Sequence, residues 1–101
     1  MDKTKQNATE LLTQWGASAA QIESIFHLDS DDSLQTRVNL LFSISDCLHL
    51  LYRDENTRNR YMLAKNNGPY FEGRKPLEII ASGKMEDLTE VHARIRMMVC
   101  I

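Results

Sequence analysis

The stretch Leu34-Gln-Thr-Arg-Val-Asn-Leu-Leu-Phe-Ser-Ile-Ser-Asp-Cys-Leu-His-Leu-Leu-Tyr52 decides the fold of this chain. Its apolar residues recur at helical spacing and form one stripe: Leu34, Val38, Leu41, Leu48 and Leu51, widened by Phe42, Ile44 and Cys47. A helix that is apolar over so much of its girth must lie at the centre of a fold. We therefore expect a long central helix over 34–52, with Cys47 and His49 in or beside its buried face.

Two short helices are predicted before the central one. Asn7, three residues before Glu10, has the spacing of a capping box and is expected to start the first helix. That helix runs to Trp15, and the glycine that follows is suited to end it. Ser18 and Gln21 repeat the capping pattern and open a second helix. The two helices form a hairpin.

Loops and caps separate the central helix from its neighbours. The polar and acidic stretch 27–33 predicts a loop that ends in a helix cap at Asp32 or Ser33. Acids and cap residues from Asp54 onward predict a fourth helix, which ends near Lys65.

The C-terminal third is expected to hold a loop and two more helices. Residues 66–74 contain two glycines and one proline and predict a loop. Pro76 suits the first position of a short fifth helix that ends at Gly83, and a sixth helix is predicted over 85–98. No segment alternates like a strand. We predict an all-α, single compact domain of about six helices, with an N-terminal hairpin packed on a long central helix and a C-terminal loop-helix-turn-helix.

Composition narrows the function classes. The chain has 101 residues, 43% of them hydrophobic and 26% charged, and a net charge of −2. This balance is that of one ordinary globular domain, with no overall positive field to attract nucleic acid or an anionic membrane. Two cysteines are too few for a disulfide framework. There is no apolar leader and no stretch apolar enough for a membrane span, so we expect a cytoplasmic protein.

The residue types needed for catalysis are scattered. His27, His49 and His92 show no spacing typical of a metal site. Glu86 and Asp87 at the start of the sixth helix are explained by the helix dipole. No phosphate-binding loop or nucleophile motif is present, so we expect no enzyme activity, no cofactor and no metal.

One ordered string in the C-terminal third is distinctive: Asn67-x-x-x-Phe71-x-Gly73-Arg74-x-Pro76-Leu77-Glu78, Gly83, Asp87-Leu88-x-x-Val91 and Ile95. Gly73 permits a backbone conformation closed to other residues. Arg74 could either clamp loop carbonyls or bind an acidic partner group. Phe71, which looks exposed beside Tyr70, could plug the core or anchor an interface.

This string resembles the toxin-binding domain of the MbcA/ParS/Xre antitoxins, whose pattern is Asn, then Phe-Gly-Gly-Arg-Ser-Pro-Leu-Asp, then Gly, Asp-Leu and Val. The match covers roughly 34–98. Two positions depart from it, because Glu72 replaces a glycine and Lys75 replaces the serine before the proline. The resemblance implies a non-catalytic antitoxin-like protein that occludes a cognate RES-type toxin, a class that consumes NAD or transfers ADP-ribose from it. The partner-binding residues expected on this basis are Tyr70, Phe71, Glu72, Arg74, Lys75, Arg94 and Arg96.

The resemblance divides the chain into a toxin-binding domain over 34–101 and a degenerate helix-turn-helix-like segment over 1–33. The segment is too short for a recognition helix, and its acidic residues would repel phosphate, so DNA binding is not expected. A DNA-binding autoregulator remains an alternative, with Lys3, Lys5 and Arg37 as a thin positive set.

A homo-oligomeric adaptor is a further alternative, and we expect self-association. The apolar run Met97–Ile101 could dock on its own core, on a second copy or in a partner's cleft.

Overall fold

A computed structural model describes residues 2–26 and 31–99, and that part of the chain contains six helices. They are α1 (Lys5–Gln14), α2 (Ala19–Phe26), α3 (Asp31–Leu51), α4 (Glu55–Leu63), α5 (Pro76–Ile80) and α6 (Met85–Val99). The radius of gyration is 12.6 Å, close to the value of about 13 Å expected for a single domain of 100 residues. The predicted all-α fold is confirmed. None of the described helices could cross a membrane.

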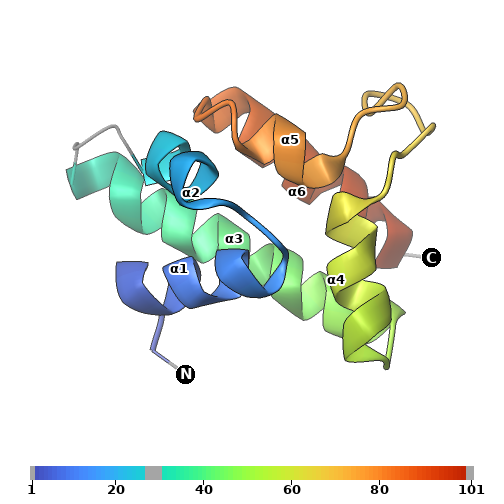
Figure 1. Ribbon diagram of the computed structural model, residues 1–101, viewed down its shortest axis with the longest axis horizontal. Helices are drawn as coiled ribbons and strands as arrows, with labels where there is room; N and C mark the ends of the chain where they lie inside the picture. Colours follow the sequence, from blue (N-terminus) through green and yellow to red (C-terminus); the bar gives the residue numbers. More distant parts are fainter. Residues whose placement is uncertain (1, 27–30, 100–101) are drawn as a thin grey trace.

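The long helix α3 is the centre of the molecule, as the sequence predicts (Figure 1). Val38, Leu41, Ile44 and Leu48 are at most 1% exposed. The last helix, α6, packs along α3 through Leu88, Val91 and Ile95. A polar contact of 2.7 Å between Ser43 Oγ and His92 Nε2 joins the same two helices. One part of the hydrophobic core therefore lies between α3 and α6.

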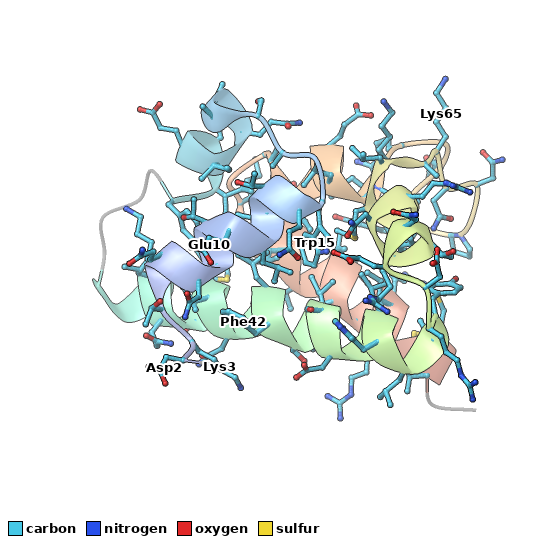
Figure 2. The ribbon with its side chains drawn as sticks, turned by 60° about the horizontal axis from the view of Figure 1, so that its bottom comes forward. Asp2, Lys3, Glu10, Trp15, Phe42 and Lys65 are labelled. Atoms are coloured by element: carbon cyan, nitrogen blue, oxygen red, sulfur yellow. The ribbon has the colours of Figure 1, made fainter. Side chains whose placement is uncertain are left out.

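The N-terminal helices cover another side of α3. Figure 2 shows α1 lying across α3, and Trp15 at the end of α1 is buried. Gly16 then takes a φ of +95° and turns the chain toward α2, which confirms its predicted role. The capping box of α2 is also confirmed. The Ser18 N–H donates to Gln21 Oε1 (2.9 Å), and the Gln21 N–H donates to Ser18 Oγ (3.2 Å).

Several helix boundaries differ from the prediction. The cap of α1 is Thr4 and not Asn7, because the Asn7 N–H donates to Thr4 Oγ1 (3.1 Å). Helix α3 begins at Asp31, so the predicted cap at Asp32 or Ser33 is wrong; residues 27–30 of the predicted loop lie outside the described residues. Helix α4 ends at Leu63, since Ala64 is already extended, and α6 continues to Val99.

Two polar residues of α3 also differ from expectation. His49 is exposed and its Nδ1 contacts the Ser45 carbonyl at 2.8 Å, so its predicted place in the core is wrong, whereas Cys47 is buried. Arg37 is only 2% exposed, and one of its terminal nitrogens reaches the Ile25 carbonyl at 3.4 Å. A side chain so deeply buried cannot belong to a positive surface.

Candidate functional site

The loop 66–74 is closed by a pair of backbone hydrogen bonds at its ends. The Asn66 N–H donates to the Arg74 carbonyl (3.1 Å), and the Gly73 N–H donates to the Asn66 carbonyl (2.7 Å). The Asn66 side chain holds the interior, because its Oδ1 accepts from the Gly68 N–H at 2.8 Å. Its Nδ2 donates to the Tyr61 hydroxyl (3.1 Å), which in turn points to Met98 Sδ of α6 (3.5 Å). We call this closure the loop clasp; it fixes the loop to α4 and α6.

Three residues of this loop have left-handed backbone conformations. Gly73, at φ +84°, takes the conformation that the sequence predicted for it. Tyr70 (φ +71°) and Glu72 (φ +49°) are the positive-φ residues other than glycine in the described chain. Side chains rarely adopt this region because their Cβ atoms crowd the backbone. The loop therefore carries strain that the surrounding contacts must hold in place.

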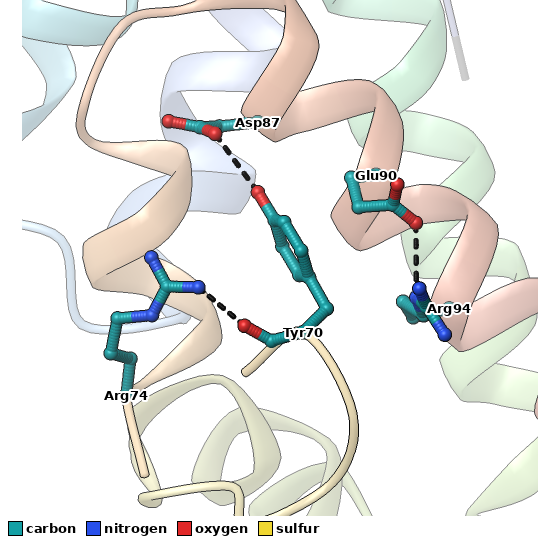
Figure 3. A network of polar contacts seen from close by, with 5 residues as sticks. All are labelled: Tyr70, Arg74, Asp87, Glu90 and Arg94. Carbon is teal, nitrogen blue, oxygen red and sulfur yellow. Dashed lines mark hydrogen bonds and ion pairs between the residues drawn. The ribbon is translucent and has the colours of Figure 1, made fainter. Parts of the chain in front are cut away.

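Tyr70 is the centre of a polar network that connects the loop to α6 (Figure 3). Its hydroxyl donates to Asp87 Oδ1 at 2.9 Å, and Asp87 Oδ2 accepts from the Ser82 hydroxyl at 2.7 Å. The Tyr70 ring meets the Phe71 ring nearly edge-on, with 5.9 Å between the centroids. These contacts place the aromatic part of the loop against the start of α6.

The network shifts the pKa values of both partners. Burial, followed by the hydrogen bond to Asp87, raises the pKa of Tyr70 to about 12. The hydrogen bond from Ser82 is the main cause that lowers the pKa of Asp87, and the bond from Tyr70 adds to it. At neutral pH the hydroxyl thus stays protonated and the carboxylate stays charged, so the contact is charge-assisted. The Tyr70–Asp87 hydrogen bond therefore holds the loop against α6.

Two arginines frame the Tyr70 ring. The Arg74 guanidinium lies 5.2 Å from the ring centroid and donates from Nε to the Phe71 carbonyl (3.0 Å) and from Nη2 to the Tyr70 carbonyl. Arg94 of α6 lies 6.0 Å from the same centroid and pairs with Glu90 through a contact of 3.0 Å. Both distances are within the range of cation–π attraction. The sequence left two roles open for Arg74, and the structure shows the first of them, hydrogen bonding to loop carbonyls.

An apolar groove lies beside this network, where the loop meets the end of α6. We call it the loop–α6 groove; its volume is about 340 Å³, and its lining residues are Asn66, Gly68, Pro69, Phe71, Arg94, Met97 and Met98. Three large apolar side chains of the described residues are exposed, Leu50, Leu63 and Met97, and of these Met97, at 65% exposure, lines the groove. The groove therefore combines a largely apolar lining with one cation, Arg94.

A second hollow, between α1 and α3, is more polar. It measures about 370 Å³, and its lining includes Lys3, Glu10, Asp46 and His49. Figure 2 looks toward this side of the molecule, with Lys3 and Glu10 labelled on it. Mixed charges with ready access to water are typical of a solvated surface, and no expected partner-binding residue lines this hollow.

No three His, Cys, Asp or Glu side chains of residues 2–26 and 31–99 lie close enough to hold a metal ion. The most perturbed hydroxyl, that of Tyr70, has a pKa shifted away from neutrality and is occupied by Asp87. A general base or nucleophile needs the opposite tuning.

The structure brings most of the expected partner-binding residues together. Four of them lie in the loop and a fifth directly follows it: Tyr70, Phe71, Glu72 and Arg74, then Lys75. Arg94 of α6 lies 6.0 Å from the centroid of the Tyr70 ring. Phe71, for which the sequence left a core plug and an interface anchor open, is only 3% exposed, and Tyr70 is half-buried.

Phe71 is thus a core plug that also forms a wall of the groove. Arg96 is exposed and stands apart from the network; its charge acts on His92.

Sequence reasoning missed the residues that connect the loop to the helices. Asp87 belongs to the ordered string but was explained by the helix dipole, because its partner Tyr70 is 17 residues away. Asn66 carried a detectable signal, since an Asn before Asn-Gly is suited to turn hydrogen bonding. Pro69 was used only as evidence for a loop, and Met97 and Met98 were noted as part of the apolar run.

No protein-family model, curated protein or solved structure matches this chain.

Proposed function

We propose that this chain is a non-catalytic protein-binding domain that neutralises a RES-type toxin in the manner of an antitoxin. The observation that carries the proposal is the loop–α6 groove, with its exposed Met97 and its adjoining Arg94. Protein interfaces favour aromatic residues, methionine and arginine, and they are strongest around a preformed pocket. The resemblance of the ordered string 67–95 to the antitoxin domain supplies the class of partner.

The proposed mechanism is stoichiometric occlusion. A side chain of the toxin enters the loop–α6 groove, while the loop and α6 lie across the entrance to the toxin's active site. The loop clasp and the Tyr70–Asp87 bond hold this surface in one shape before the toxin arrives. A surface that is already ordered loses little conformational entropy on binding. The chain acts by exclusion of substrate and needs no chemistry of its own.

The test is co-expression of this chain with a RES-type toxin, with growth and complex formation as readouts. We expect the wild type to restore growth and to co-purify with the toxin. Met97→Asp should abolish both, because it places a charge on the exposed wall of the groove. Leu50→Asp is the matched control, since Leu50 is 75% exposed and lies outside the groove. Equal loss with both variants, or no complex with the wild type, would reject the proposal.

Self-association is a second candidate, favoured by the exposure of Met97. An uncovered apolar side chain of this size also suits a contact with a second copy. Light scattering of the wild type and of Met97→Asp decides the matter. A dimer that becomes a monomer on substitution supports this candidate, and a wild type that is monomeric at high concentration removes it.

A further inference from the structure

Among the described residues that line the loop–α6 groove, Arg94 is the one with a charge. Its side chain is 35% exposed, so solvent reaches the guanidinium. An arginine has five N–H donors, and Glu90 accepts one of them, because its Oε2 lies 3.0 Å from Arg94 Nε. Within the described chain, the two terminal nitrogens of Arg94 make no hydrogen bond or ion pair. The groove wall thus contains a cation whose outer donors are available.

Two contacts restrict the position of this guanidinium (Figure 3). Glu90, one turn earlier on α6, contacts Nε, and the centroid of the Tyr70 ring lies 6.0 Å from the guanidinium carbon. Since Glu90 occupies Nε, the edge formed by the two terminal nitrogens of Arg94 is the part left for a ligand. Two N–H groups at such an edge match the two oxygens of a carboxylate. The ligand group that fits this edge is therefore a carboxylate.

The rest of the groove is suited to an apolar side chain. Pro69, Phe71, Met97 and Met98 line it, and Phe71, at 3% exposure, is fixed in the core. Methionine side chains adapt to the shape of what they contact. The volume of about 340 Å³ lies near the lower end of the range of small-molecule pockets, about 300–1,000 Å³, and suits a short segment. A basic occupant is disfavoured, because Arg94 would repel it.

We propose that the loop–α6 groove binds a segment of the partner protein in which an apolar side chain is followed by an aspartate or glutamate. The apolar side chain packs against Phe71 and Met97, and the carboxylate accepts from the terminal nitrogens of Arg94. Complementary charge of this kind contributes specificity, since a partner with a neutral or basic residue at that place loses the bond or is repelled. The inference rests on the proposed function for the identity of the partner, because it names the part of the toxin that enters the groove.

The test is an NMR titration of the full chain with two capped peptides, acetyl-Gly-Leu-Glu-Gly-amide and its analogue with Gln in place of Glu. The glutamate carboxylate is the one charge that distinguishes them, and the methyl signals of Met97 and Met98 report occupancy of the groove. We expect the Glu peptide to bind about fivefold more tightly than the Gln peptide. This preference should decline at about 1 M salt. Equal binding of both peptides would assign the groove to a purely apolar contact, such as a second copy, and would overturn the inference, as would no shift with the Glu peptide.

Three variants of α6 assign the preference to Arg94. Arg94→Gln should bind the two peptides alike, whereas Arg96→Gln, the matched control, should keep the preference, since Arg96 is exposed and does not line the groove. Glu90→Gln leaves an acceptor for Nε and removes a negative charge, so it should bind the Glu peptide more tightly than the wild type does. A preference that survives Arg94→Gln, or that Arg96→Gln loses equally, would overturn the inference. The methyl spectrum of each variant without peptide verifies that it is folded, and Arg94→Lys, which keeps the charge, should retain part of the preference.

The peptide titration contains no toxin, so its outcome is separable from that of the co-expression experiment. If a RES-type toxin forms the complex and the two peptides bind alike, this inference fails and the proposed function stands. If the Glu peptide is preferred and no RES-type toxin forms a complex, the proposed function fails and the groove retains its preference for an acidic segment. In a toxin complex that does form, Arg94→Gln should weaken binding about fivefold and Arg96→Gln should not.

Discussion

Tyr70 holds a conformation that bulky residues avoid, and its surroundings explain why it can. Its hydroxyl bonds to Asp87, its ring meets Phe71, and two guanidinium groups lie near the ring face. Tyr70 makes all of these contacts from a left-handed backbone with a φ of +71°. The residue therefore sets the shape of the loop, and its neighbours keep it there.

Removal of the Tyr70 hydroxyl measures the contribution of its hydrogen bond. Tyr70→Phe should lower the free energy of unfolding by about 1 kcal/mol or somewhat more, because Asp87 loses a donor. Tyr52→Phe is the control, since no described residue bonds to the Tyr52 hydroxyl. Urea denaturation compares the two variants with the wild type. An equal effect of both would mean that the Tyr70–Asp87 bond adds nothing to stability.

Residue-level predictions from sequence succeeded where the backbone alone decides. Gly16 and Gly73 take positive φ values, as their places after a helix and within a turn suggested. The exposure of His49 was predicted wrongly, whereas for Phe71 the sequence left open whether it plugs the core or anchors an interface. Both outcomes depend on which distant element packs against the residue, and the neighbouring sequence does not identify that element.

Among the elements, the start of α1 shows how two good cap residues compete. Thr4 and Asn7 are three residues apart, and both types favour the N-cap. The sequence favoured Asn7 through its spacing to Glu10. In the structure the helix starts at Lys5, because Thr4 Oγ1 accepts the Asn7 N–H and Asn7 lies within the first turn.

Substitution of each cap candidate distinguishes these two starts of α1. Thr4→Ala should lower the free energy of unfolding by about 1 kcal/mol, the usual loss for a cap. Asn7→Ala should cost less, because Asn7 lies within the helix and its side chain bonds to the exposed Asp2 carbonyl. Thermal unfolding gives both values. A larger loss for Asn7→Ala would place the cap where the sequence had indicated.

The turn between α1 and α2 depends on the element α4 as well as on its own glycine. A Cβ at position 16 would lie 2.7 Å from Leu63 Cδ1, and the backbone there has a φ of +95°. Gly16→Ala should therefore lower the free energy of unfolding by more than about 1 kcal/mol.

The double variant Gly16→Ala/Leu63→Ala should recover only part of that loss, because it removes the clash and leaves the backbone strain. If the double variant recovered the full free energy of unfolding in urea denaturation, the clash with Leu63 would account for the whole loss.

At the scale of the molecule, the sequence predicted the fold class and the central place of α3. Both follow from the amount of apolar surface on one helix, which the chain itself displays. The loop–α6 groove could not be predicted, because its walls come from Pro69, Phe71 and Met97, and only the packing of α6 on α3 brings them together.

Stability of the whole molecule should depend on pH through His92. The pKa of His92 is lowered below its usual 6.5, first by burial and second by the charge of Arg96. The unfolded chain then binds the proton more readily, so stability is full above pH 6.5 and falls as the pH decreases below it. His92→Gln removes this titration and should flatten the decline between pH 7.5 and pH 5. An unchanged slope in urea denaturation would assign the decline to other groups.

The loop clasp has a consequence for the kinetics of recognition. A loop without regular structure usually has to order itself when a partner arrives, and that step slows the encounter. Here the bonds between Asn66 and the residues 73–74 have closed the loop beforehand. Association with the proposed toxin should therefore show a single bimolecular phase whose observed rate grows linearly with toxin concentration. Variants of the loop–α6 groove should then differ mainly in the lifetime of the complex.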